Sequence, residues 1–307
     1  MVIATSAAAN PTANARAVLG IRHPIVQGPF GGGLSSVRLL AAVSERGGLG
    51  SFGCHMLGGD AMMALGREIR AATSAPFALN LWISNDDPGG LAPTSEQWAE
   101  AIERFRPYFE EAQVALPTRP HSADIAPPIA DQLDALLELR PPVFSFVFGI
   151  PSPAILQACR QRGIATVGAA TSIAEAQALE AAGVSAIVAT GFEAGGHRPS
   201  FLARAEDSLM GTFALTQLVS RRVRIPVIAA GGIVDDAGVR AALALGAHAI
   251  QVGTAFLACE ESGARPSHRA LLHSPRSHAT ALTRSFSGRL ARGLSNRWTQ
   301  EWRDRAA

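Results

Sequence analysis

The stretch 191-GFEAGGHR-198 places an imidazole at the end of an apolar run, 184-VSAIVAT-190. Gly195 and Gly196 come directly before His197, so a flexible turn carries the side chain. In parallel α/β barrels, active sites lie where strands end and helices begin. An imidazole titrates near neutral pH and can take a proton from a carbon acid. His197 is therefore the candidate general base, and His55, on the loop after an earlier apolar run, is its nearest rival.

Two glycine-containing turns nearer the C-terminus are candidates for holding a phosphate. These turns, 231-GGIVDD-236 and 251-QVGTAF-256, each follow an apolar run. Glycine lets backbone N–H groups approach an anion, and Thr254 can add a hydroxyl donor. The loops after strands seven and eight of a (β/α)8 barrel often bind a phosphate at a helix N-terminus. Gly253 and Thr254 would open that helix, and the two turns together predict a phosphate site.

Asn80 is a polar residue inside an otherwise apolar run, 77-FALNLW-82. A buried amide must find hydrogen-bond partners. Two interpretations stay open on this residue alone: a structural hydrogen bond, or a contact with a cofactor ring at the edge of the sheet. A further glycine-rich turn, 27-QGPFGGG-33, follows the first apolar run and would face the same edge.

The elements that would position these residues are eight short apolar runs. Each is nearly continuous rather than alternating, which is typical of parallel strands covered on both faces. The runs are 24-PIVQG-28, 48-GLGSFG-53, 77-FALNLW-82, 143-VFSFVF-148, 164-IATVGA-169, 184-VSAIVAT-190, 226-PVIAAGG-232 and 248-HAIQVGT-254.

Segments of helical period lie between these runs and carry the expected end signals. Helices are expected over 36–46, 60–73, 95–113, 153–162, 172–182, 208–221 and 235–245. Their N-cap candidates are Ser36, Asp60, Ser172 and Asp235, and their C-terminal glycines are Gly47, Gly163, Gly183 and Gly246. The alternation predicts an α/β fold, a (β/α)8 TIM barrel with an insertion after the third strand. A doubly wound sheet is the alternative.

The chain is expected to be a single domain, 1–307, with an insertion over roughly 83–140. The segments 83–94 and 114–128 are rich in Pro, Gly and Asp, as loops are. They are interpreted either as a lid over the barrel mouth or as plain surface loops.

Composition excludes several classes of function. The 27 basic residues are all Arg, which rules out Schiff-base chemistry on lysine and a lysine-containing phosphate loop. The net charge of +2 offers no strong field for nucleic acid or a membrane. The Arg residues over 284–305 are interpreted as a solvated segment, with an anion site as the alternative. No His and carboxylate spacing typical of a metal site occurs.

The N-terminus and the cysteines bear on location. The first 18 residues lack the basic and apolar regions of a signal peptide, and no run of about 20 apolar residues could span a membrane. Cys54, Cys159 and Cys259 are odd in number and widely spaced, so reduced thiols in a cytoplasmic protein are expected. Whether the chain forms a homodimer stays open.

A set of motifs resembles the nitronate monooxygenase family, formerly called 2-nitropropane dioxygenases. The similarity covers about 21–298 and is weakest in the insertion. The motifs are QGPFGGG, AAVSERGGLGSFG, FALNLW, GFEAGGHR, PVIAAGGI, QVGTAFL and FSGRLARGLSNRW. The resemblance implies a TIM barrel that binds FMN non-covalently and needs no metal.

The resemblance also implies roles for individual residues. His197 would be the catalytic base, Asn80 would bond the FMN, and the remaining residues would contact the flavin ring or its phosphate. These residues are Pro29, Phe30, Gly31, Thr190, Gly195, Gly196, Gly231, Gly232, Gln251, Val252, Gly253 and Thr254.

Two positions depart from the family pattern. Thr190 stands where members often carry Gln, so one contact with the flavin or substrate would differ. Arg198-Pro199 follows the histidine where many members have a further glycine. Arg198 is interpreted either as a residue that attracts an anionic substrate or as a surface residue.

The implied reaction is the oxidation of alkyl nitronates or nitroalkanes by O2 to carbonyl compounds and nitrite. His197 would remove the α-proton of a nitroalkane, and FMN would pass an electron on to O2. The alternative is an NAD(P)H-dependent flavin reductase with a similar glycine–histidine loop, either a quinone reductase or an enoyl-ACP reductase. Fold alone does not separate these chemistries. A flavin store or sensor would have no need of His197.

Overall fold

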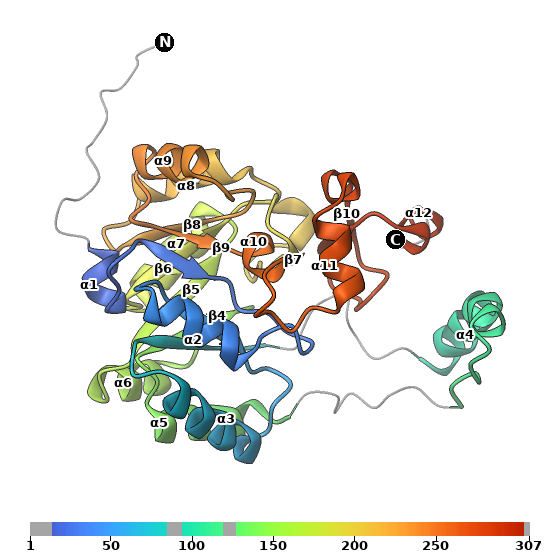
Figure 1. The fold of residues 1–307 in the computed structure, drawn as a ribbon, viewed down its shortest axis with the longest axis horizontal. Coiled ribbons are helices and arrows are strands. Elements are labelled where there is room, and N and C mark those ends of the chain that lie inside the picture. Colours follow the sequence, from blue (N-terminus) through green and yellow to red (C-terminus); the bar gives the residue numbers. More distant parts are fainter. Residues whose placement is uncertain (1–13, 85–93, 119–126, 304–307) are drawn as a thin grey trace, which may run out of the picture.

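The computed structural model describes residues 14–84, 94–118 and 127–303 of this 307-residue chain. Its centre is a barrel of eight parallel strands with helices around it (Figure 1). The strands are β1 (Ile25–Gln27), β2 (Gly50–Gly53), β3 (Phe77–Trp82), β4 (Val143–Val147), β5 (Ala165–Ala170), β6 (Ala186–Thr190), β8 (Val227–Ala230) and β9 (Ala249–Val252).

The strands form a ring in the order β1-β9-β8-β6-β5-β4-β3-β2. A parallel bridge between Val26 and Leu49 closes the ring between its two end strands. The backbone N–H of Gln27 donates to the Leu49 carbonyl at 2.9 Å, and that of Leu49 donates to the Ile25 carbonyl at 2.9 Å. The predicted (β/α)8 barrel is confirmed, and the doubly wound alternative is wrong because no open edge separates β1 from β2.

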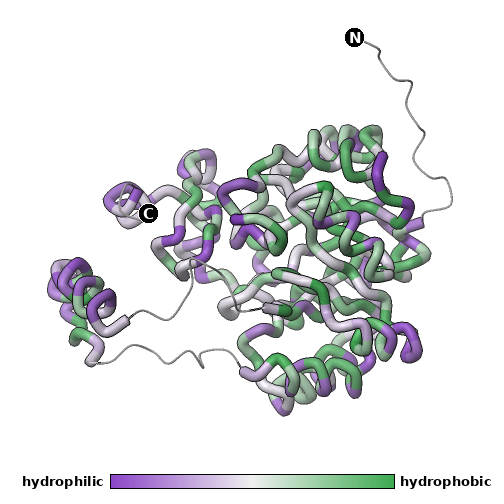
Figure 2. The backbone as a smooth tube through the Cα atoms, turned by 180° about the vertical axis from the view of Figure 1, so that it is seen from behind, coloured by the Kyte–Doolittle hydropathy of each residue, from purple (hydrophilic) through white to green (hydrophobic). Residues whose placement is uncertain are grey.

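The outer helices bury one apolar face each against the strands. The helices after the first, second, fourth, fifth, sixth and seventh barrel strands are α2 (Val37–Glu45), α3 (Gly59–Ala72), α6 (Pro153–Gln161), α7 (Ile173–Ala181), α8 (Thr212–Ser220) and α9 (Asp236–Ala244). In α3 the buried residues Met62, Leu65 and Ile69 recur at helical spacing. Each such side chain contributes about 1.5–3 kcal/mol to folding. Figure 2 shows hydrophobic residues along the barrel strands and the inward sides of these helices.

Most predicted helix ends are confirmed. The side chains of Ser36, Ser172 and Asp235 accept hydrogen bonds from backbone N–H groups of the first turn. Gly47, Gly163, Gly183 and Gly246 all have positive φ after the helix ends. Two expectations are wrong. Gly58 is the N-cap of α3, and Asp60 lies inside its first turn. The helix expected from Ser208 begins only at Thr212, because a short 3-10 turn, η2 (Ala205–Asp207), precedes it.

The segment after β3 contains two helices with different surroundings. The helix α5 (Ile129–Leu139) packs on α3, α6 and β3, so it covers the barrel as the helix of the third unit. The helix α4 (Ser95–Glu111) contacts the C-terminal helix α12 (Arg297–Glu301) through Phe105, which stacks on Trp298 at 5.2 Å. Figure 1 shows both beside the barrel rather than against its strands. Most of the loop over 83–94 lies outside the described residues.

The two ends of the barrel are closed differently. At the amino ends of the strands, α1 (Ala15–Leu19) contributes Ala15 and Leu19 to the cluster that fills the barrel interior. At the other end, the residues beyond β9 form α10 (Thr254–Leu257), α11 (Pro266–Leu272), η3 (Pro275–His278), β10 (Thr280–Thr283) and β11 (Ala291–Leu294). With β7 (Gly196–His197), β10 and β11 form a small antiparallel sheet in the order β10-β11-β7. Figure 1 shows these elements on the side away from α1.

The described residues contain no helix long and apolar enough to cross a membrane.

Candidate active site

The barrel interior is open to solvent at the carboxyl ends of its strands. Alternate residues of a strand face the interior, and Val143 belongs to the cluster of side chains that fills it. On the same face of β4, Ser145 and Val147 are half-buried, while Phe144 and Phe146 on the helix-facing side are almost wholly buried. Gln251 at the end of β9 is half-buried in the same way. Side chains at the carboxyl ends of the strands are therefore partly exposed to solvent, and we call this partly exposed interior face the hollow at the mouth of the barrel.

Asn80 and Thr190 lie on the interior face of this hollow, each with hydrogen bonds to the protein itself. Asn80 pairs in register with Ser145, and its Nδ2 donates to the Ser145 Oγ at 3.0 Å. Thr190 is the last residue of β6, is buried, and its Oγ1 donates to the Val188 carbonyl at 3.4 Å. Gln251 pairs with Ala230 of the neighbouring strand. The structural hydrogen bond considered for Asn80 is present. It does not exclude the alternative, a contact between Asn80 and a cofactor ring.

His197 stands at the rim of the hollow on β7. That short strand pairs with β11, which places His197 opposite Ala291. The imidazole packs edge-on against Trp82 at 5.0 Å between ring centroids, and its Nε2 lies 2.8 Å from the Ser287 Oγ. The strand pairing and the two side-chain contacts fix where the ring points.

Other predicted residues continue the rim on both sides of His197. The His55 ring stacks on Trp82 at 3.9 Å, and a Cβ built on Gly31 would lie 3.7 Å from the His55 ring. A Cβ built on Gly253 would lie 4.0 Å from the Phe30 ring. Pro29 lies between Phe30 and β1, and Val252 pairs with Gln27 of β1.

The rim is completed on the far side by the loop that leads to His197. A Cβ built on Gly195 would lie 3.6 Å from the Thr254 Oγ1. Ring contacts therefore link His55, Trp82 and His197. The backbone approaches His55 at Gly31, Phe30 at Gly253 and Thr254 at Gly195. The structure gathers the residues predicted for cofactor and base around one opening.

At some glycines of the mouth an added Cβ would clash with the protein, and at others it would meet open space. Only open space could hold a ligand, so this difference tests whether one fits there. A Cβ on Gly231 would lie 2.6 Å from the Thr212 Oγ1 and 2.9 Å from the Ala194 nitrogen, so this glycine is needed by packing and by its φ of 123°. Gly232 also has positive φ, 67°, and faces the side chain of Glu193. A Cβ built on Gly196 or Gly253 would meet nothing closer than 4.0 Å. Gly196 also has a positive φ of 80°, so only at Gly253 does the missing side chain leave open space without a backbone reason for glycine, as a bound phosphate requires.

Arg198 is neither a surface residue nor a residue that attracts substrate. It is buried, and its guanidinium donates to the carbonyls of Thr190 at 3.0 Å, Gly191 at 2.6 Å and Ser208 at 2.6 Å. Burial lowers the pKa of Arg198 to about 10, although the carboxylates of Glu175 and Glu193 counteract part of this effect. Both interpretations drawn from the sequence are wrong, because the side chain turns inward and ties the end of β6 to Ser208, which follows Arg198 by ten residues.

His55 is held on its loop by a residue of α5. The Nε2 of the buried Gln132 donates to the carbonyls of Cys54 at 3.3 Å, His55 at 2.8 Å and Leu57 at 2.8 Å. Burial lowers the pKa of the His55 imidazole below its ordinary value of 6.5, and the positive charge of Arg289 lowers it further. At neutral pH His55 is therefore the uncharged aromatic partner of Trp82.

The C-terminal arginines are not a solvated segment as a whole. Arg289 is buried, with its Cζ 4.3 Å from the Phe148 ring centroid and 5.3 Å from that of Trp82. Arg284 forms an ion pair with Glu206 at 2.7 Å, and Arg292 donates to the Phe192 carbonyl at 2.9 Å. This prediction is wrong because β10 and β11 fold back over the mouth and bring these side chains with them.

The sequence reasoning missed the aromatic wall of the site. Trp82, Phe148, Ser287 and Arg289 lie at the mouth, and none was singled out. Phe148 has a positive φ, 61°, which is uncommon for a bulky residue and marks a constrained position after β4. A Trp at the carboxyl end of the third run was the one available signal.

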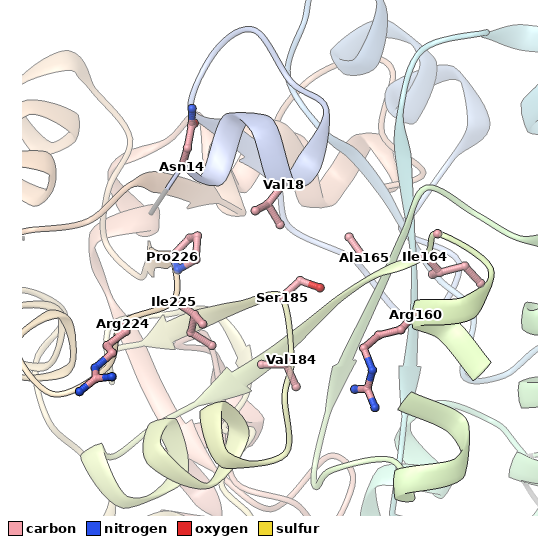
Figure 3. A pocket seen from close by; sticks show the side chains of 11 residues that line it. Asn14, Val18, Arg160, Ile164, Ala165, Val184, Ser185, Arg224, Ile225 and Pro226 are labelled. Carbon is pink, nitrogen blue, oxygen red and sulfur yellow. The ribbon is translucent and has the colours of Figure 1, made fainter. Parts of the chain in front are cut away.

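A separate cavity of about 540 Å³ lies at the opposite end of the barrel (Figure 3). It is lined by residues of α1 and the segments that lead into β5, β6 and β8, among them Val18, Ser185 and Pro226. Its place under the amino ends of the strands separates it from His197. Within the described ranges, no cluster of three or more His, Cys, Asp or Glu side chains could hold a metal ion.

The fold is that of a TIM-barrel enzyme, the architecture in which active sites lie at the carboxyl ends of the strands. The family model for nitronate monooxygenase matches residues 13–307. The chain belongs to the nitronate monooxygenase family, a family of flavoproteins, and the resemblance seen in the motifs is confirmed.

Particular relatives agree with this assignment. A nitronate monooxygenase of Paraburkholderia phytofirmans is 42% identical over 285 residues, which cover 92% of this chain and 76% of the relative. The structure of nitroalkane oxidase from Streptomyces ansochromogenes superposes with a TM-score of 0.84 at 36% identity, covering 93% of this chain and 80% of that one. FabK from Thermotoga maritima is a more distant neighbour, with a TM-score of 0.71 at 30% identity over 94% of this chain and 78% of its own.

Proposed function

We propose that this chain binds FMN at the mouth of its barrel and oxidises alkyl nitronates or nitroalkanes with O2, giving carbonyl compounds and nitrite. The relatives named for this chemistry align over more than nine-tenths of the chain. The three cysteines form no disulfide among the described residues, which agrees with a reducing compartment such as the cytoplasm.

The FMN would lie with its ring over the hollow and its phosphate beside the turns after β8 and β9. Asn80 and Thr190 would face the ring from within the barrel. The backbone of Pro29, Phe30 and Gly31 would border it on one side, and that of Gly195 and Gly196 on the other. The phosphate would be held by backbone N–H groups of Gly232 and the run 251–254, with the Thr254 hydroxyl as a further donor. The open space beside Gly253 supports this placement.

Bound FMN would supply an acceptor for the electron of the substrate and a route for it to O2. The chain itself must orient the substrate carbon and, for a neutral nitroalkane, remove its α-proton. His197 is the proposed base, with Nε2 as the atom that takes the proton. Ser287, 2.8 Å from that atom, would hold the ring in place until the substrate arrives. A nitronate is already deprotonated, so its oxidation does not need the base.

The observation that carries the proposal is the place of His197, at the rim of an open barrel mouth and against Trp82. The test is the variant His197→Asn, assayed for nitrite release with nitroethane and with ethyl nitronate. Loss of a general base should lower kcat/KM for nitroethane by about 10²–10⁴-fold. The value for ethyl nitronate should stay within about tenfold, because no proton is removed.

His278→Asn, at an exposed histidine of η3, is the matched control and should change neither value. Equal losses on the two substrates, or none on nitroethane, would remove the role of His197 as base. Mass spectrometry of the flavin released by denaturation decides between FMN and another flavin. The reductase alternative predicts instead that NADH or NADPH reduces the bound flavin rapidly.

A further inference from the structure

One cation is buried inside the aromatic wall of the mouth. Arg289 is only 6% exposed, and its guanidinium lies against the faces of two rings, Phe148 and Trp82. Its Nη2 donates to the Ser84 carbonyl at 3.4 Å. The two ring centroids are only 4.8 Å apart, so both rings lie to one side of the guanidinium, whose N–H donors form a planar fork.

The same short segment brings this cation and the partner of His197 to the rim together. Ser287 contacts His197 Nε2 at 2.8 Å, and Arg289 follows two residues later, just before β11. Trp82 is shared, because its ring contacts both the His197 imidazole and the Arg289 guanidinium. The base and the cation therefore flank one aromatic residue at the edge of the hollow.

The charge of Arg289 is felt inside the mouth. This charge lowers the pKa of His55, whose ring stacks on Trp82. His55 is half-buried and stacked on Trp82, so water screens this electrostatic effect less than it would at an exposed site. A small anion in the hollow would be attracted by the same field.

We propose that Arg289 binds the two oxygens of the substrate's NO2 group and favours the anionic nitronate in binding. This inference rests on the proposed function. A nitronate carries its negative charge on two coplanar oxygens, and a guanidinium offers a planar fork of donors that matches them. With a neutral nitroalkane, the same charge develops only as His197 removes the proton, so Arg289 would then stabilise the transition state rather than the bound substrate.

The test compares Arg289→Gln with the wild-type holoenzyme on the same two substrates. For ethyl nitronate we expect KM to rise by about 10–100-fold, the usual cost of losing hydrogen bonds to a charged group. For nitroethane we expect kcat to fall by a similar factor while KM changes less than about threefold. Arg276→Gln, at an exposed arginine of η3, is the matched control and should behave as wild type.

A second measurement does not depend on turnover. Isobutyrate has the planar two-oxygen anion and the branched carbon of propyl-2-nitronate but cannot react. Its dissociation constant, measured by calorimetry, should rise about 10–100-fold in Arg289→Gln. In Arg289→Lys, which keeps the charge without the fork, it should rise about fivefold to tenfold. The lysine variant decides the question if the glutamine variant does not fold.

If the folded Arg289→Gln and Arg289→Lys variants bind isobutyrate as tightly as wild type, Arg289 does not bind the substrate's two oxygens. This conclusion holds for any substrate of the enzyme. A wild-type enzyme that binds isobutyrate through Arg289 but does not oxidise nitronates would instead overturn the proposed function and leave the anion site standing.

Discussion

At the scale of single residues, His55 shows how the mouth controls a titratable group. Its folded-state pKa lies below 6.5 because burial and the charge of Arg289 both disfavour the imidazolium. The unfolded chain binds a proton at His55 near pH 6.5, and the folded chain binds it only at lower pH. As the pH falls through 6.5, the unfolded chain takes up a proton that the folded chain does not bind, so the free energy of unfolding decreases.

We predict that the free energy of unfolding falls more steeply between pH 7.5 and pH 5.5 in the wild type than in His55→Gln. Above pH 7.5 the contribution of His55 is constant, since the imidazole is neutral in both states. Urea titrations at four pH values in this range measure the difference. Parallel pH profiles for the two proteins would show that the His55 pKa is not lowered on folding.

Arg198 carries a second prediction at this scale. In Arg198→Met the three carbonyls that it binds lose their donor, two of them at the base of the loop to His197. Because leaving buried polar groups unpaired costs about 1–3 kcal/mol each, we expect a loss of at least about 2 kcal/mol in stability. Thermal unfolding measures it, and Arg276→Gln is the control. A variant as stable as wild type would mean that water replaces the guanidinium without cost.

At the scale of elements, the turns after β8 and β9 hold glycines for different reasons. Gly231→Ala would place a Cβ against Thr212 and Ala194 at a φ of 123°, so we expect a less stable protein, by about 1–3 kcal/mol. Gly253→Ala meets open space at an ordinary φ of −105°, so the apoprotein should keep its stability. That variant should instead bind FMN at least about tenfold more weakly, because its methyl group enters the phosphate space.

Unfolding of the two apoproteins and fluorescence titration with FMN distinguish these outcomes. If Gly253→Ala binds FMN as tightly as wild type, the phosphate does not lie beside the turn after β9.

The barrel itself was predictable from local patterns, since the strands are continuous apolar runs and most of the helix ends carry their own signal. Ser36 and Gly47, for example, mark the limits of α2 within the sequence. The prediction of Asp60 as N-cap is wrong because Gly58, two residues earlier, already occupies that position. A cap is a property of backbone geometry, and residue type alone only favours it.

The site was predictable where it depends on glycine and histidine at strand ends, and not where it depends on contacts distant in sequence. Arg198 follows His197 directly, yet its partners on either side of the loop become neighbours only in the fold. Arg289 reaches Trp82 across 207 positions of the chain, through a hairpin with only weak strand signals. Such pairings carry no periodic pattern that a single sequence could reveal.

At the scale of the whole molecule, the two ends of the barrel have separate tasks. The α1 end is filled by apolar side chains, which stabilises the closed ring. The opposite end is left hollow and is bordered by the small sheet of β7, β10 and β11. Phe105 and Tyr108 of α4 pack on Trp298 and Trp302 near the C-terminus, so the segment inserted after β3 and the end of the chain meet beside this mouth.

The measurement that tests the account most directly is an anaerobic titration of the purified flavoprotein, followed by its visible absorbance. Propyl-2-nitronate is added to one cuvette, and NADH or NADPH to another. The account predicts that the nitronate reduces the flavin and that both pyridine nucleotides leave it oxidised. Rapid bleaching by NADH or NADPH, with no response to the nitronate, would contradict the proposed function and identify a flavin reductase.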